Sequence, residues 1–415
     1  MRAFILGLTA LWTAGAEERL ALRPLMQEAL RANPEVLAAR KRYEAATHRP
    51  ARESALPDTM ISGGYASTGS PRPLANLGTD PVANIGVMIT QELPGPGKRG
   101  LRGEIAEREA DAEFQQYQAA QLSVLTRVKS AWHRLGAAYD LLDILRSTQN
   151  LVQETVKVTE VRYAAGQAAQ QDIFKAQTQR AALDLRLERL RQEIRSREAE
   201  LNALLARQPG TPLGRPLPVP APEFRLALAE LMNAAQKNSP ELARERKRIE
   251  REELSVNLAR KGLQPDYAVS GGYFNMGRMA DMYQFRVDIT LPVFNRGRVR
   301  SEVAERSAEL TAARRGFEAA GQTIAFRLQE DYRAAETSRK ILDLYRDTLI
   351  PQARLTLESS IPAYSQGKVE FLTLLNNLLA VLEYETTSRE EELNYVLALV
   401  RLEELTALEL VEVGA

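Results

Sequence analysis

The sequence predicts a mainly α-helical protein with a small transmembrane β part, written as a two-fold internal repeat of helix, strand, strand, long helix and helix. Two short stretches alternate apolar and polar residues, whereas nearly all of the remaining chain spaces its apolar residues by three and four. Landmarks of the first half also recur in the same order in the second half, about 206 residues later.

The clearest alternating stretch is residues 282–294, MYQFRVDITLPVF. A second stretch, residues 84–94, has the same period of two and also ends in Leu-Pro. Proline cannot donate to a strand ladder, so it is expected at strand ends. A strand of about 9–11 residues with one apolar face is the unit of a membrane β-barrel.

The alternation also predicts which way the strand residues face. We expect Val287 and Ile289 to contact lipid, and Arg286 and Asp288 to line the lumen. The repeat supplies four strands per chain, whereas the smallest membrane barrels have eight. Several copies must therefore share one barrel, and strand count alone allows two, three or four copies.

The repeat is carried by pairs of short motifs. Pro57-Asp58 followed by Gly63-Gly64-Tyr65 recurs as Pro265-Asp266 followed by Gly271-Gly272-Tyr273. Tyr163-x-x-Gly166 recurs as Tyr364-x-x-Gly367. We expect a first repeat at 17–207 with a β-hairpin at 58–94, a linker at 208–222, a second repeat at 223–408 with a hairpin at 266–292, and a tail at 409–415. The linker holds six prolines, which exclude a helix there.

Each half has the same expected order of elements. In the first half these are a helix at 20–55, strands at 58–67 and 84–93, a long helix at 98–163, a turn at 164–166 and a return helix at 169–207. In the second half they are a helix at 226–262, strands at 266–275 and 283–291, a long helix at 298–361, a turn at 364–367 and a return helix at 369–408. A helix of some 65 residues is roughly 100 Å long. Pro351 should kink the second long helix.

The start of the chain predicts a secretory signal peptide over residues 1–16. Arg2 precedes an apolar run, and Ala14-Gly15-Ala16 has the small residues of a cleavage site. The net charge of +1 argues against a nucleic-acid partner, which needs clustered basic residues.

No pattern of catalytic residues is present. The chain has no cysteine, which excludes disulfides and thiolate chemistry. Its two histidines, His48 and His133, are expected to be ordinary helix-surface residues. Gly95-Pro96-Gly97-Lys98 lacks the spacing of a phosphate-binding loop and is expected to be a strand-to-helix turn. We therefore expect no enzymatic activity and no cofactor.

Three methionines, Met276, Met279 and Met282, fall in the second predicted hairpin. Soft thioethers favour Cu(I), but flexible methionines also fill loops as packing residues. The packing interpretation is preferred, so no metal ligand is assigned, and a metal site stays as the alternative.

With these residues in place, the chain resembles the TolC family of outer-membrane efflux and secretion channels over residues 20–408. The resemblance depends on the duplication, the Leu-Pro strand ends and the two Tyr-x-x-Gly turns. Three motifs resemble the heavy-metal branch (cobalt-zinc-cadmium and copper-silver efflux), namely Leu-Pro-Gly-Pro-Gly-Lys-Arg at 93–99, Met-x-x-Met-x-Asp-Met at 276–282 and Leu-Pro-Val-Phe-Asn-Arg-Gly at 291–297.

The resemblance implies a homotrimer whose 12-stranded β-barrel in the outer membrane is continued by a long α-helical barrel across the periplasm. The channel would pass substrate, with heavy-metal cations as one class, from periplasm to exterior, together with a periplasmic membrane-fusion adaptor and an inner-membrane pump of the resistance-nodulation-division type. It also implies that the two turns are periplasmic tips where the channel closes and the adaptor docks. The tip residues are Arg162, Tyr163, Gly166, Asp172, Tyr364, Gly367 and Lys368. Arg162 and Asp172 flank the first turn, where we expect them to form a charge-assisted bond.

The chain departs from the family pattern on the pore helix after the second tip. Thr373 and Asn376 stand where some relatives carry the aspartates of an acidic ring. Two other classes of protein remain open at this point: a coiled-coil scaffold, periplasmic or cytosolic, and a metal-binding protein that uses the methionine triplet without channel activity. The alternating strands favour the channel.

Overall fold

The computed structural model describes residues 19–411 except 70, 73, 219, 294 and 295. The signal peptide expected at 1–16 and the end of the expected tail, residues 412–415, lie outside the described residues. The chain divides into two compact units, each described here by itself. The helical unit comprises Met1–Leu37, Ala120–Ser239 and Ile324–Ala415, and the sheet unit comprises Ala38–Ala119 and Pro240–Thr323. Each unit takes segments from both halves of the chain.

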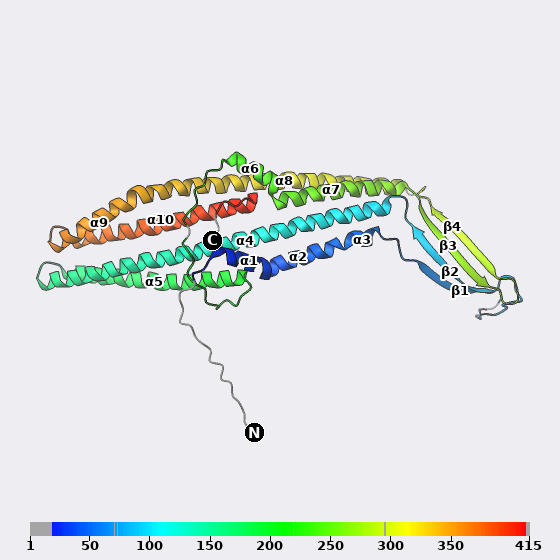
Figure 1. Ribbon diagram of the computed structural model, residues 1–415, viewed down its shortest axis with the longest axis horizontal. Coiled ribbons are helices and arrows are strands. Elements are labelled where there is room, and N and C mark those ends of the chain that lie inside the picture. The colour runs from blue at the N-terminus through cyan, green and yellow to red at the C-terminus, as the bar shows by residue number, and fades with distance from the viewer. Residues whose placement is uncertain (1–18, 70, 73, 219, 294–295, 412–415) are drawn as a thin grey trace, which may run out of the picture. The chain divides into compact units, whose positions relative to one another are not determined.

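The elements follow the order that the sequence predicts (Figure 1). The first half contains α1 (Leu22–Ala32), α2 (Pro34–Thr47), α3 (Arg49–Ser54), β1 (Met60–Ala66), β2 (Asn84–Leu93), α4 (Lys98–Ala164) and α5 (Gln170–Leu204). The second half contains α6 (Leu228–Asn238), α7 (Pro240–Arg260), a 3₁₀ turn η1 (Lys261–Leu263), β3 (Asp266–Asn275), β4 (Met282–Thr290), α8 (Arg296–Leu344), a π turn η2 (Tyr345–Leu349), α9 (Ile350–Ser365) and α10 (Phe371–Thr406).

The single helices expected at 20–55 and 226–262 are wrong, because both are interrupted at a proline. Asn33 and Ser239 leave the helical region, with ψ angles of 124° and 118°, directly before Pro34 and Pro240. A residue before proline is pushed toward extended conformations, and proline itself starts a helix readily. The breaks therefore fall at corresponding positions of the two halves.

The described strands form one antiparallel sheet in the order β1-β2-β3-β4. Thr90 of β2 lies opposite Ser270 of β3, and their hydroxyl oxygens are 3.0 Å apart. The outer edges of β1 and β4 pair with no other strand among the described residues. The sheet is therefore open on both sides within one chain.

The register gives this sheet two different faces. The apolar face is formed by Ile61, Tyr65, Ile85, Val87, Ile89, Leu93, Tyr267, Val269, Tyr273, Tyr283, Phe285, Val287 and Ile289. The opposite face carries mainly small and polar residues, including Ser62, Thr90, Glu92, Ser270, Gln284, Arg286 and Asp288. Large apolar residues on that face are Phe274 and the methionines Met60, Met88 and Met282. A Cβ atom on residue 86 would lie only 2.4 Å from the nearest atom of the Phe274 ring, so only glycine fits at that position.

The turn between β2 and α4 is tied to the start of β3 within the sheet unit. The Lys98 Nζ lies 2.8 Å from Asp266 Oδ1, and the Gly95 N–H donates to the same oxygen at 2.6 Å. Gly97 has a φ of +77°, which favours glycine. The expected strand-to-helix turn at residues 95–98 is confirmed.

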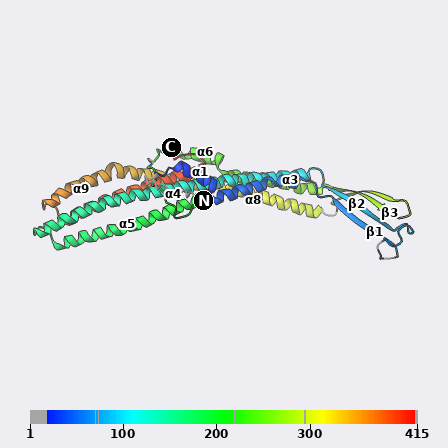
Figure 2. The ribbon, with the colours of Figure 1, turned by 60° about the horizontal axis from the view of Figure 1, so that its bottom comes forward.

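In the helical unit, α10 and α4 lie between α9 and α5 in both views (Figures 1 and 2). The apolar residues spaced by three and four on α5 are buried, as the sequence predicts: Leu183, Leu187, Leu190, Ile194 and Leu201. The Lys129 Nζ of α4 lies 2.7 Å from Glu403 Oε2 of α10, and both side chains are buried. The Glu403 Oε1 also accepts hydrogen bonds from the N–H groups of Leu410 and Val411, both at 2.7 Å.

The interruption expected at Pro351 is present as the π turn η2, which separates α8 from α9. Proline has no N–H to donate to the carbonyl four residues earlier, which here is that of Asp347 within η2. A local π turn accommodates the missing bond.

No helix in the described part of the chain is long and apolar enough to cross a membrane.

Candidate functional site

The two Tyr-x-x-Gly turns fold into the same backbone motif. In the first turn, the N–H of Gly166 donates to the Tyr163 carbonyl at 2.9 Å and the N–H of Gln167 to the Arg162 carbonyl at 2.8 Å. In the second, Gly367 donates to Tyr364 at 3.0 Å and Lys368 to Ala363 at 2.9 Å. This is the Schellman motif, which requires a left-handed residue after the helix. Gly166 and Gly367 supply it with φ angles of +71° and +76°.

One side chain joins the two turns. Arg162, near the end of α4, donates from Nη1 to the Tyr364 carbonyl and from Nη2 to the Gln167 carbonyl at 3.1 Å. Its guanidinium carbon also lies 4.4 Å from the centre of the Tyr364 ring, a cation–π contact. A cation at the ends of α4 and α9 is favourable, because helix C-termini carry negative partial charge. Arg162 therefore holds the two turns of one chain side by side.

Tyr364 is the buried centre of this contact. Its side chain is 2% exposed, its ring packs edge-on against Phe371 at 5.9 Å, and its hydroxyl donates to Thr159 Oγ1 at 3.1 Å. Tyr163 occupies the corresponding position of the first turn, yet 44% of it is exposed. The two turns thus share a backbone but differ in which tyrosine is buried.

The other predicted tip residues do not join this cluster. Asp172 lies in the first turn of α5, where a carboxylate favours the positive end of the helix. Arg162 bonds carbonyl groups of both turns, so the Arg162–Asp172 pair that the sequence suggests is not the contact that forms. Lys368 is exposed beside the second turn.

Thr373 and Asn376 are exposed on α10. They are separated from the buried face that Phe371, Leu374 and Leu378 form.

Thr159 and Phe371 complete the cluster and were not among the predicted residues. Thr159 is fully buried, and its hydroxyl donates a hydrogen bond to the Thr155 carbonyl at 2.8 Å. Ser360 holds the corresponding place four residues before Tyr364 and accepts a bond from Asn377. A polar residue four positions before each tyrosine is therefore the signal in the sequence that could have found this position.

On the sheet, the Arg286 Nε lies 2.9 Å from Asp288 Oδ2. Both side chains lie on the polar face, next to Ser270 and Ala268 of β3, whereas Val287 and Ile289 lie on the apolar face. The predicted alternation along β4 is present.

The methionine triplet lies beside the loop between β3 and β4. Met276 is half-buried, and Met279 and Met282 are 36% and 39% exposed. Among the described residues, no three His, Asp or Glu side chains gather as a metal cluster.

His133 is not a surface residue, and its predicted placement is wrong. Burial, together with the positive charge of Lys129, lowers the pKa of His133 to about 4, so its imidazole is neutral at neutral pH. Its Nε2 is buried and bonds no atom in the described part of the protein. The neighbouring Trp132 donates to the Leu20 carbonyl at 3.1 Å, which brings the start of the described chain against this side of α4. His48, in contrast, is exposed as expected.

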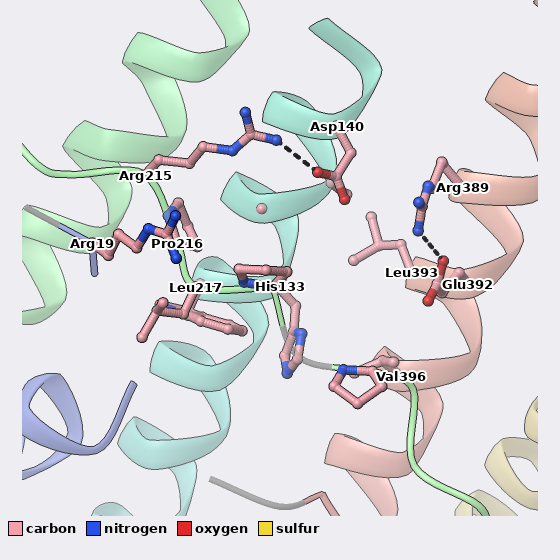
Figure 3. A pocket seen from close by; sticks show the side chains of 15 residues that line it. Arg19, His133, Asp140, Arg215, Pro216, Leu217, Arg389, Glu392, Leu393 and Val396 are labelled. Carbon is pink, nitrogen blue, oxygen red and sulfur yellow. Dashed lines mark hydrogen bonds and ion pairs between the residues drawn. The ribbon is translucent and has the colours of Figure 1, made fainter. Parts of the chain in front are cut away.

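His133 lines a cavity of about 620 Å³ between α4, α10 and the linker (Figure 3). On one wall, Arg215 Nη2 lies 3.0 Å from Asp140 Oδ1. On the other wall, Arg389 Nη1 lies 2.5 Å from Glu392 Oε2. Each ion pair is thus completed on its own wall. The neutral imidazole between them provides a hydrogen-bonding atom but no charge.

Comparison with known proteins agrees with this architecture. The family model described as "Outer membrane efflux protein" matches residues 25–207 and 231–408. The chain is 22% identical over 390 residues to the outer membrane protein TolC of Vibrio cholerae, a match that covers 87% of this chain and 83% of TolC. It is 23% identical over 288 residues to the cobalt-zinc-cadmium resistance protein CzcC of Cupriavidus metallidurans, covering 68% of this chain and 66% of CzcC. Among solved structures, CusC, whose structures are described in terms of transmembrane channel formation, superposes with a TM-score of 0.80 at 13% identity, covering 96% of this chain and 95% of CusC.

The fold and the paired turns define a protein of one small antiparallel sheet and long helices, the fold that CusC also has. The chain belongs to the outer membrane efflux protein family, the family of TolC. It is an outer-membrane component of tripartite efflux that extends into the periplasm, in a family of transport channels rather than enzymes.

Proposed function

We propose that three copies of this chain form one exit channel, with twelve strands closing a barrel in the outer membrane and the long helices continuing it as a helical barrel. The observation that carries the proposal is the open sheet with one apolar face and two unpaired edges. An open sheet edge in lipid leaves backbone groups unbonded at several kcal/mol each. Strands of neighbouring copies would bond the free backbone groups of β1 and β4, and lipid would cover the apolar face.

Light scattering of the purified protein in mild detergent tests the assembly. A mass of three chains is expected, and a monodisperse monomer would contradict the proposal. Urea washing of membranes tests the rival scaffold, because a peripheral coiled-coil protein is released, whereas a channel with its strands in lipid is retained.

The polar face of the sheet, including Arg286 and Asp288, lines the lumen under this proposal. The turns at Gly166 and Gly367 form the periplasmic tips, and the residues around them, the exposed Tyr163 and Lys368 and the half-buried Asp172, meet the adaptor. Thr373 and Asn376 face the pore without a carboxylate. Since the chain has no native cysteine, Tyr163→Cys provides a single thiol for cross-linking to a cysteine-bearing adaptor. Gln192→Cys, exposed further along α5, is the matched position that should not react with the adaptor.

We further propose heavy-metal cations as the substrate class, exported with a periplasmic adaptor and an inner-membrane pump of the resistance-nodulation-division type. The similarity to CzcC and the motifs at 93–99, 276–282 and 291–297 support this class. Loss of the channel from its host should lower tolerance to cobalt, zinc, cadmium, copper or silver and leave drug tolerance unchanged. The opposite pattern would assign the channel to drugs.

A further inference from the structure

The helical unit has two outer helices, α5 on one side and α9 on the other, with α10 and α4 between them (Figures 1 and 2). Each outer side exposes large apolar side chains. On α5, Phe174 and Leu185 are 57% and 54% exposed, and on α8 and α9, Leu344 and Leu355 are 61% and 60% exposed. Such side chains on two different sides of a protomer are suited to a contact with a further helix on each side.

Two basic residues lie beside the apolar side chains of α5 and two acidic residues lie near those of the other side, while Asp184 and Arg354, of the opposite sign, directly precede Leu185 and Leu355. Lys175 and Arg186 lie next to Phe174 and Leu185 on α5, whereas Asp347 and Glu358 lie three residues after Leu344 and Leu355. All four charged side chains are exposed, and none is in an ion pair in the part of the chain that the structure describes. Lys175 and Arg186 are eleven residues apart, about three helical turns, so they share one face of α5. Asp347 and Glu358 are also eleven residues apart.

The opposite charges lie at equal distances from the two turns. Lys175 follows Gly166 by nine residues, and Glu358 precedes Gly367 by nine. Arg186 follows Gly166 by twenty residues, and Asp347 precedes Gly367 by twenty. Because Arg162 joins the two turns, both sets of distances start from the same level. At 1.5 Å per residue the charges lie about 13 Å and 30 Å from the turns along their helices.

We propose that the outer face of α5 in one copy packs against the outer face of α8, η2 and α9 in the next copy, with Lys175 opposite Glu358 and Arg186 opposite Asp347. This inference rests on the proposed trimer and names the surfaces that close it. The contact is heterologous, since one copy gives its α5 side and the other its α8 and α9 side, and such contacts form a ring when the rotation between copies closes. The four exposed leucine and phenylalanine side chains become the apolar centre of the seam, and the charges set its register.

Cross-linking between two differently marked copies tests the seam directly. One copy carries Lys175→Cys and an affinity tag, the other carries Glu358→Cys, and the chain supplies no other thiol. A short bismaleimide should join them into a covalent dimer, and Arg186→Cys with Asp347→Cys should react equally well. The crossed combination, Lys175→Cys with Asp347→Cys, is the matched control, because its two positions differ in height by about 16 Å.

A charge exchange provides a second measurement, since a cysteine variant can itself fail to assemble. Arg186→Glu should lower the fraction of trimer that survives SDS by roughly threefold or more, and Arg186→Glu with Asp347→Arg should restore it.

A trimer that gives no matched cross-link, or reacts equally in the crossed combination, would overturn the seam and leave the trimer standing. Failure of the double exchange to restore assembly would also overturn it. A parent protein that is monomeric by light scattering would instead refute the proposed function itself.

Discussion

The guanidinium of Arg162 in the first turn donates a hydrogen bond to the main-chain carbonyl of Tyr364 in the second turn. The two residues are 202 positions apart in the chain, and their contact is also a cation–π contact. The ends of the two helical hairpins in one copy are therefore linked before any second copy or adaptor is present. If these ends close the channel, opening must break this link or move both turns together.

The first prediction concerns this link. The double variant Arg162→Ser with Tyr364→Phe removes the bond between the turns and the hydroxyl bond to Thr159, each worth about 1 kcal/mol net. We expect higher single-channel conductance in planar bilayers and greater antibiotic leakage, with unchanged trimer yield. Lys368→Ser, which removes an exposed charge at the same end, is the control. A lower trimer yield with unchanged conductance per channel would mean that Arg162 only caps the helix ends.

The second prediction separates the two faces of β4. Val287→Arg puts a charge on the apolar face and should cost about 2–4 kcal/mol near mid-membrane, which reduces assembly. Asp288→Arg changes the polar face, so assembly should persist while conductance changes. Trimer yield and single-channel conductance measure the two effects. Equal behaviour of the two variants would show that the assigned facing is wrong.

The third prediction treats the methionines as packing residues. Replacing Met276, Met279 and Met282 with leucine keeps their bulk and removes the sulfur ligands. Copper or silver tolerance of a host that depends on the channel should stay the same. A metal-specific loss of tolerance at a normal protein level would instead identify a thioether site.

The fourth prediction concerns the buried pair of Lys129 and Glu403. Glu403→Gln leaves the Lys129 ammonium buried without a counter-charge, which typically costs about 3–5 kcal/mol. The melting temperature should fall sharply, and Lys129→Met with Glu403→Gln should recover most of the loss. Glu404→Gln, at the next position, is the control and should change little.

The fifth prediction is a pH dependence from His133. Its pKa falls from the ordinary 6.5 to about 4 in the folded protein, so between these values the unfolded chain binds a proton that the folded chain does not. Stability therefore decreases as the pH falls from 6.5 toward 4, by about 3 kcal/mol in total. Melting temperatures of the wild type and of His133→Gln should differ in their pH slope over this range. His48→Gln, which changes an exposed histidine, should keep the wild-type slope.

The strands were predictable because their signal is local. A period of two places β2 at 84–93 and the internal repeat places β3 at 266–275, the ranges that the structure has, while β1 and β4 differ from expectation by one or two residues at their ends. The breaks at Asn33 and Ser239 were missed although Pro34 and Pro240 follow them. The spacing of apolar residues predicts one continuous helix through each position, whereas proline pushes the residue before it out of the helical region. The structure follows the proline.

The candidate site was only partly predictable, because its contacts join residues far apart in the chain. Spacing identified Gly166 and Gly367, whose role depends on their own backbone. It did not identify the partner of Arg162, since a nearby Asp172 looked chemically suitable and the actual acceptors are carbonyl groups. The burial of His133 likewise depends on packing between α4, α10 and the linker, which helical periodicity alone does not specify.

The central ladder of the sheet pairs Thr90 with Ser270, 180 residues later, whereas the outer two ladders are local hairpins. Bringing such distant segments together costs loop entropy before any ladder bond forms, so the two hairpins precede the complete sheet. A lone two-stranded hairpin is marginally stable and presents open edges to other chains. During biogenesis, each newly exported chain therefore passes through a stage with two unprotected hairpins. We therefore expect the yield of this channel to rise with a periplasmic chaperone that shields strand edges.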